Sequence, residues 1–210
     1  MYPIRLDGER AVLRELVSDD ERPLAEIIRI DRGARWDPSP LPRWLRERIA
    51  ASVAPERTDY ALAITTQHSG ELVGTARLRI EAPADRRAAL WMLLIPEQQE
   101  QGAGVEALAL LLHLGFARLG LHRIAARCDP QDLVARRVLD KGGMRLEGHL
   151  RHERRVAGSW RDELLYAIVE DEWNDGPGLQ AAQSPEAWPF GDRTTPGLDT
   201  GHTRLPRRTR

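Results

Sequence analysis

Two glycines, Gly102 and Gly104, stand between an apolar segment that ends at Ile95 and a segment with helical periodicity. In the second segment the apolar residues recur at steps of three and four, at Val105, Leu108, Leu112, Phe116 and Leu119. That spacing marks one buried face of a helix. Glycines let a backbone approach a ligand closely, and the free N–H groups at a helix start favour a phosphate. The stretch therefore predicts a pyrophosphate cradle. The alternative is a strand–helix corner in which glycine serves packing.

The spacing of these glycines excludes two common phosphate loops. It does not fit G-x-x-x-x-G-K-[ST], and Ala107 stands where G-x-G-x-x-G needs its third glycine. Gln99-x-x-Gly102-x-Gly104, which follows Pro96-Glu97, instead resembles the acyl-CoA loop of the GNAT N-acetyltransferases, whose pattern is [QR]-x-x-G-x-[GA].

Further segments resemble the same family in the same order along the chain. They are Leu6–Arg14 (opening strand), Leu119–Ile124 (helix-to-strand join), Arg137–Met144 (R-V-L-E-K-x-G-F motif), and Leu146–Gly148 with Trp160–Tyr166 (C-terminal hairpin). The hairpin is similar to that of the RimJ/RimL-like branch, which acetylates ribosomal-protein N-termini and small amines. The resemblance implies an α/β GNAT fold: a mixed, mostly antiparallel sheet with helices on both faces and acyl-CoA in a central splay.

The resemblance also implies a set of cofactor contacts. The N–H groups of Gln101, Gly102, Ala103, Gly104 and Val105 would surround the pyrophosphate of acetyl-CoA or another acyl-CoA, and Gln99 would bind a phosphate oxygen or brace the turn. The backbone of Leu93, Leu94 and Ile95 would pair with the pantetheine arm and polarise the thioester carbonyl. Asp132 and Arg137 belong to the same expected set. Glu100 is expected to point to solvent, because a carboxylate repels a pyrophosphate.

Transfer to an amine needs a base for the ammonium proton and an acid for the leaving thiolate. The usual positions of these groups hold Ala89, Ala135 and Leu139 here. Asp132 stands where the branch has asparagine, and it either binds pantetheine or acceptor or caps a helix. Glu153 is our predicted base, acting through water.

Trp36, Trp44 and His152 are the predicted acceptor contacts, since the resemblance places their segments at the acceptor mouth. The alternative for both tryptophans is core or lid packing. His149 and Asp162 lie on the same hairpin as His152. Cys128 falls near the expected CoA sulfur, although packing as a small apolar residue is its favoured role, and His122 is expected to be structural. No His/Cys spacing suggests a metal.

The periodicity of the chain predicts the elements that must position these residues. Helices are expected at 21–32, after a capping box from Ser18 to Glu21, and at 42–53, 105–119 and 132–142. Strands are expected at 10–17, 59–66, 71–80, 88–95, 123–128, 144–155 and 160–169. The run at 88–95 is nearly all apolar, which is typical of a central strand buried on both faces.

Composition sets the outer limits. The 210 residues carry 31 Lys+Arg against 32 Asp+Glu, so no global charge argues for a nucleic acid or a membrane. One cysteine cannot form an internal disulfide, and no apolar run suggests a signal peptide or a membrane span. We therefore expect a cytoplasmic protein with an acyltransferase domain at 1–173. Residues 174–210 are rich in Pro and Gly, and we expect a disordered tail with a basic end.

The main hypothesis is an N-acetyltransferase that acts on a primary amine of a small molecule or a protein N-terminus, without metal or membrane and with a homodimer left open. The altered acid positions keep two alternatives open: a CoA-binding sensor without turnover, and a donor such as aminoacyl-tRNA. A third hypothesis, RNA binding by the basic tail, is less favoured than a solvated tail.

Overall fold

The computed structural model describes residues 3–32, 37–96, 102–156 and 158–173. The predicted tail therefore lies outside the described residues. An eight-stranded sheet runs in the order β1-β2-β3-β4-β5-β6-β8-β7. Its strands are β1 (Arg5–Asp7), β2 (Ala11–Glu15), β3 (Asp59–Thr66), β4 (Leu72–Ala82), β5 (Arg87–Leu94), β6 (Arg123–Cys128), β7 (Arg145–Val156) and β8 (Ser159–Val169). Each neighbouring pair is antiparallel except β5 and β6, which are parallel.

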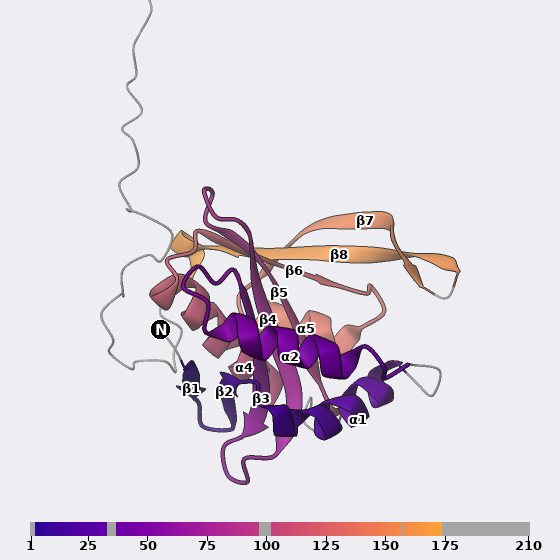
Figure 1. The fold of residues 1–210 in the computed structure, drawn as a ribbon. Coiled ribbons are helices and arrows are strands. Elements are labelled where there is room, and N and C mark those ends of the chain that lie inside the picture. The colour runs from indigo at the N-terminus through magenta and orange to yellow at the C-terminus, as the bar shows by residue number, and fades with distance from the viewer. Residues whose placement is uncertain (1–2, 33–36, 97–101, 157, 174–210) are drawn as a thin grey trace, which may run out of the picture.

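Helices cover both faces of the sheet, as Figure 1 shows. On one face lie α1 (Glu21–Arg32) and α2 (Leu41–Ser52); on the other lie α4 (Ala103–His113) and α5 (Leu133–Lys141). Helix α4 continues through a π-helical turn, η2 (Leu114–Arg118), and short 3-10 turns occur at η1 (Ser18–Asp20) and η3 (Glu170–Glu172). This arrangement confirms the predicted α/β fold.

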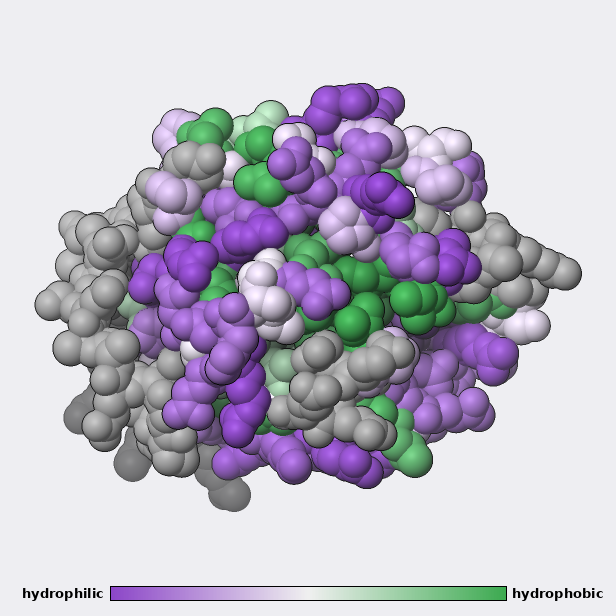
Figure 2. Space-filling view, turned by 90° about the horizontal axis from the view of Figure 1, so that it is seen from below, coloured by the Kyte–Doolittle hydropathy of each residue, from purple (hydrophilic) through white to green (hydrophobic). Residues whose placement is uncertain are grey.

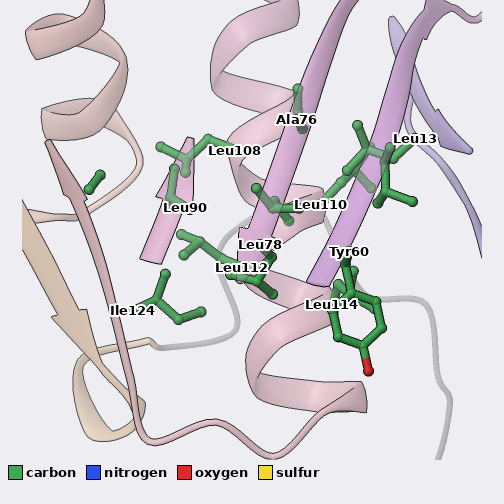
Figure 3. Packing of buried hydrophobic residues seen from close by; sticks show 14 of the residues in the cluster. Leu13, Tyr60, Ala76, Leu78, Leu90, Leu108, Leu110, Leu112, Leu114 and Ile124 are labelled. Carbon is green, nitrogen blue, oxygen red and sulfur yellow. The ribbon is translucent and has the colours of Figure 1, made fainter. Parts of the chain in front are cut away.

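The main core lies between the sheet and α4. Leucines of the helix, among them Leu108, Leu110 and Leu112, pack against Leu78 of β4 and Leu90 of β5 (Figure 3). A smaller cluster joins α1 and α2 to β3 through Leu24, Leu45, Ala61 and Ala63. Because alternate strand residues belong to these two clusters, cluster membership tells which face each strand residue occupies.

The α1/α2 face is covered over only part of its width. Helix α1 contacts β4 and α2 contacts β3, whereas Trp91 of β5, on the same face, is 44% exposed. The expectation that 88–95 is buried on both faces is therefore wrong. From below, Figure 2 shows a largely hydrophilic surface with hydrophobic residues gathered in the middle of that view.

Two local expectations at the N-terminus are also corrected. The predicted opening strand is a hairpin of β1 and β2, since the backbone turns at Gly8, whose N–H donates to Ala11 O (2.9 Å). The residue that caps the first helical turn is Asp20, not Ser18 or Glu21. Its Oδ2 accepts from the N–H of Val17 at 2.9 Å, and Arg14 holds the same carboxylate.

Candidate active site

The sheet opens between β5 and β6. Their parallel pairing begins at Arg87–Arg123 and ends at Leu90–Ala126, although β5 continues to Leu94 and β6 to Cys128. Beyond that point β5 stays paired with β4, and β6 stays paired with β8. The two strand ends therefore border a gap at the middle of the sheet.

The backbone alternation of β5 decides which groups face this gap. The N–H of Ile95 donates to Val73 O on β4 at 2.9 Å, so the N–H groups of residues 91 and 93 also face β4, and those of Met92 and Leu94 face the other way. The sheet pairing with β6 has already ended at Leu90. Within the described part of the chain, the N–H of Met92 therefore has no partner in the sheet. Met92 was not among the predicted contacts, whereas Ile95, which was, has its N–H bonded to Val73 O.

The start of α4 supplies a second set of donors. Gly102 is the N-cap residue with φ +83°, and no side chain caps the helix. A Cβ on Gly102 would meet no atom of the described residues within 4 Å, so among those residues the space before the helix is open. The first N–H groups of a helix have no partner within it and carry its positive dipole end. Residues 102–105 therefore fit a pyrophosphate.

Gly104 has a packing role. A Cβ there would lie 3.3 Å from Val138 Cγ2 of α5, so glycine lets the two helices approach. The packing alternative raised for the glycine pair therefore holds at Gly104, whereas the open space and positive φ at Gly102 favour a ligand.

The carboxylate of Glu106, in the first turn of α4, points away from the open helix start at residues 102–105. Its Oε1 accepts from the N–H of Glu9 (2.6 Å), and its Oε2 accepts from the N–H groups of Arg10 (2.8 Å) and Ala11 (2.7 Å). The negative charge is thereby bound to the β1–β2 turn. Nothing in the sequence pattern indicated this contact, which joins residues almost a hundred positions apart.

The part of the α1/α2 face that no described helix covers borders the gap with an aromatic ring and paired charges. Trp91 lies opposite Arg77 of β4 in the register. Across the gap, Arg127 of β6 forms ion pairs with Glu153 and, at 3.8 Å, with Glu163. An acceptor that reaches the gap from this face would meet Trp91 first.

Residues 10–145 match the family of acetyltransferase (GNAT) domains. The chain belongs to the GNAT acetyltransferase family. This membership confirms the predicted family, the GNAT N-acetyltransferases, whose cofactor is acetyl-CoA. Among the helices that the structure describes, none is long and apolar enough to cross a membrane.

Several individual proteins are similar to this GNAT chain. The uncharacterized N-acetyltransferase YnaD of Bacillus subtilis is 42% identical over 79 residues, which is 38% of this chain and 46% of YnaD. YoaA of the same organism is 27% identical over 175 residues, covering 81% of this chain and 98% of YoaA. The spermidine N(1)-acetyltransferase of Escherichia coli is 28% identical over 104 residues, covering 50% of this chain and 56% of that enzyme.

Among solved structures, Mycobacterium smegmatis RimJ in complex with CoA-disulfide superposes with a TM-score of 0.72 at 25% identity, covering 82% of this chain and 90% of RimJ. These relatives are named as N-acetyltransferases or carry CoA, which favours turnover over the alternative of a sensor without it. The acceptor that each relative uses is its own property and does not by itself assign one to this chain.

The structure separates the two residues predicted as catalytic. Asp132 is the N-cap of α5, where its Oδ1 accepts from the N–H of Ala135 at 2.8 Å. Glu153 lies on β7 and forms an ion pair with Arg127 of β6. The neighbours of Arg127 in β6, Ala126 and Cys128, belong to the main core, so Arg127 lies on the opposite, α1/α2 face. No contact joins Asp132 to Glu153 among the described residues.

The β7–β8 hairpin carries the other predicted acceptor contacts. Three residues, 151–153, stand opposite Asp162 in a bulge, and the resulting hollow of about 590 Å³ is lined by His149, Leu150, Arg151, His152, Glu153 and Asp162. Asp162 accepts from the N–H of His152 (2.9 Å), which has φ +53°, and is hydrogen-bonded to His149 Nε2 (2.8 Å). These two bonds lower the pKa of Asp162. Asp162 therefore stabilises the bulge that presents His152.

The other residues that the sequence singled out are packing residues, exposed residues or residues outside the described ranges. Trp44 is half-buried against the α1/α2 cluster, Leu139 is core, and Arg137 is exposed on α5. Trp36, Gln99, Glu100 and Gln101 lie outside the described residues. His122 is half-exposed and lies 3.7 Å from Glu170.

Cys128 is 9% exposed within the main core. Burial, with Asp132 as the next contribution, raises the pKa of its thiol to about 11. The thiol is therefore protonated near neutral pH, which argues against a nucleophile. Within the described ranges, no three His, Cys, Asp or Glu side chains gather where they could hold a metal ion.

Proposed function

We propose that this chain transfers the acetyl group of acetyl-CoA to a primary amine, with the thioester carbonyl bound by the N–H of Met92 in the gap between β5 and β6. The observation that carries the proposal is the end of the β5–β6 pairing at Leu90, next to an uncapped helix start at Gly102. One feature offers a donor for a carbonyl oxygen and the other offers donors for a phosphate, as an acyl-CoA requires.

Acetyl-CoA supplies a thioester, and the chain supplies orientation. The N–H groups of residues 102–105 hold the pyrophosphate, and the edge of β5 holds the pantetheine arm. The N–H of Met92 hydrogen-bonds the carbonyl oxygen and stabilises the negative charge that develops on it during attack. A preorganised donor of this kind acts without reorganising solvent.

The amine approaches from the α1/α2 face, beside Trp91. Its nitrogen forms a C–N bond with the carbonyl carbon while the C–S bond breaks and CoA leaves as a thiolate. A thiolate is a fair leaving group, so an acid at the position of Leu139 is not required. The amine proton passes through water to Glu153 of β7. Arg127, near the end of β6 on the same face, holds Glu153 in an ion pair. Positioning of the two reactants supplies most of the rate.

The test removes the N–H of Met92 from the gap. Met92→Pro lacks the donor, and Met92→Leu keeps it with a side chain of similar size. We expect Met92→Pro to lower kcat about 10²–10³-fold, as loss of one oxyanion donor does elsewhere. Met92→Leu should stay close to the original enzyme.

The assay is release of free CoA thiol from acetyl-CoA across a panel of primary amines. Circular dichroism and thermal unfolding of both variants establish that the sheet is intact, and calorimetric titration with acetyl-CoA establishes that the donor still binds. A folded, acetyl-CoA-binding Met92→Pro protein with undiminished kcat would show that the carbonyl is bound elsewhere.

A further inference from the structure

A second cavity lies on the α1/α2 face, between the C-terminal half of α2 and the strands β3 and β4. It has a volume of about 440 Å³. We call it the arginine pocket, because its charged lining residues are Arg48, Arg57, Arg77, Arg79, Glu56 and Asp59. None of these residues has a role in acetyl transfer as proposed above.

The carboxylates near the arginine pocket do not balance its cations. Glu15 neutralises Arg57 in a buried ion pair at 2.5 Å. Asp59 is shared between Arg48 and Arg77, and its Oδ2 lies 2.6 Å from Arg77 Nη2. Burial acts to raise the pKa of Asp59, but the hydrogen bond and charge of Arg77, with the charges of Arg48 and Arg79, lower it below its ordinary value. Asp59 is therefore a single fixed negative charge between two guanidinium groups.

Arg79 adds a positive charge that no carboxylate of the described residues contacts directly, although it acts on Asp59 from a distance. Its side chain is exposed, and among the described residues it forms neither a hydrogen bond nor an ion pair. Even when the exposed Glu56 is counted, the pocket keeps an excess of positive charge. Several guanidinium groups that converge on a cavity favour an oxyanion, to which arginine can donate two hydrogen bonds at once.

The register places this pocket beside the acceptor approach. Arg77 lies directly opposite Trp91, and Arg79 lies opposite Ala89 on the same face. Directly opposed side chains on neighbouring strands are about 5 Å apart at Cβ, and diagonal ones about 7–8 Å. A group bound at Arg79 is therefore within the length of a small molecule from Trp91, which precedes Met92 in the strand.

We propose that the arginine pocket is an oxyanion subsite of the acceptor site, so that the preferred acceptor is an amine that also carries a carboxylate or a phosphate. This rests on the proposed function above. The same charges disfavour a polycationic amine, because every added ammonium group would meet excess positive charge. In this respect the chain would differ from the relative named as a spermidine acetyltransferase.

The experiment compares matched acceptors that differ only in the anion. 4-Aminobutyrate is paired with 4-aminobutyramide, and O-phosphoethanolamine is paired with ethanolamine, so the two pairs distinguish a carboxylate from a phosphate. Each amine is assayed for kcat/KM with acetyl-CoA, and its binding to the full chain is measured by calorimetry in the presence of CoA. Spermidine is the polycationic comparison.

The decisive variant is Arg79→Gln, because Arg79 is exposed and, among the described residues, forms no hydrogen bond or ion pair whose loss would disturb the fold. Arg43→Gln is the control: Arg43 is an exposed arginine of α2 that pairs with Glu47 at 2.8 Å, outside the pocket. We expect at least one anionic amine to be preferred over its neutral partner. Arg79→Gln should reduce that preference about fivefold, as expected for an exposed charge contact, and Arg43→Gln should leave it unchanged.

Two kinds of failure are distinguishable. If no amine is acetylated, the proposed function fails, and the binding arm still decides the subsite. If anionic and neutral amines bind and react equally, or if Arg79→Gln leaves the preference intact, the subsite proposal is overturned while acetyl transfer stands. A preference for spermidine would overturn it as well.

Discussion

Replacement of Glu106 tests how the first turn of α4 is anchored. The two oxygens of its carboxylate accept three backbone hydrogen bonds at 2.6–2.8 Å from Glu9, Arg10 and Ala11. The β1–β2 turn fits closely around this group, since a Cβ on Gly8 would lie only 2.6 Å from Glu106 Cδ. The anchor therefore requires a carboxylate at position 106 and glycine at position 8.

The magnitude follows from the three bonds and their surroundings. A hydrogen bond to a charged group contributes about 1.5–3 kcal/mol net. In Glu106→Ala the N–H groups of Glu9 and Arg10 regain water because both residues are exposed, whereas Ala11 is fully buried. We therefore expect the free energy of unfolding to fall by about 2–4 kcal/mol. For a chain of this length, that lowers Tm by about 4–16 °C.

Glu106→Gln separates charge and acceptor number from shape. The glutamine amide keeps one acceptor oxygen, but its NH₂ group must face a backbone N–H that needs an acceptor. We expect it to lose about 2 kcal/mol despite its nearly identical size. Glu9→Gln is the control, because the Glu9 side chain is 87% exposed and such a change alters stability by less than about 0.5 kcal/mol.

Urea unfolding at neutral pH, followed by tryptophan fluorescence and circular dichroism, measures all three variants. If Glu106→Ala and Glu9→Gln unfold at the same urea concentration with equal slopes, the three bonds do not hold the turn to α4, and the account of this anchor is wrong. A loss confined to Glu106→Ala, with Glu106→Gln unaffected, would show that bulk rather than acceptor number matters.

Three further outcomes follow from the site. Glu153→Gln should lower kcat about 10²-fold with an unchanged KM for acetyl-CoA, and equal kcat would remove Glu153 as the base. Cys128→Ala should keep kcat/KM, because burial raises the pKa of the Cys128 thiol to about 11, and a large loss would assign the thiol a role in the reaction. The pKa of Asp59 is below its ordinary value because Arg77, Arg48 and Arg79 outweigh burial. Its contribution to stability is therefore present above about pH 4 and lost as the pH falls through the folded value. Asp59→Asn should be less stable at pH 7 and should show a flatter loss of stability in acid; an unchanged acid slope would contradict this.

The elements were predictable where the local pattern and the core agree. The strand at Arg123–Cys128 and the helix capped by Asp132 and ended by Gly142 follow from apolar periodicity and stop signals that the tertiary structure only reinforces. The N-terminal hairpin was not predictable in this way. Its turn at Gly8 is stabilised by Glu106, which is distant in sequence. The local pattern alone therefore predicts one continuous strand across Gly8.

The candidate site was predictable only in its loop. The Gly102–Gly104 pattern is local, and the structure gives Gly102 the positive φ and open space that a ligand loop needs. Met92 was missed because the direction of an N–H on β5 depends on its register with β4, which one sequence does not reveal. The arginine pocket was missed for the same reason, since Arg48, Arg77 and Asp59 come from three separate elements.

The gap between β5 and β6 is held open by contacts on both of its sides. On β5, Gly74 of β4 approaches so closely that a Cβ would lie 2.2 Å from Leu93 O, and Leu93 packs into the α1/α2 cluster. On β6, Arg127 is bound to carboxylates of β7 and β8. Each strand end therefore belongs to a different half of the molecule. The N–H of Met92 is in place before any ligand arrives, so in the reaction we propose it would stabilise the developing oxyanion without first having to break a bond of the sheet.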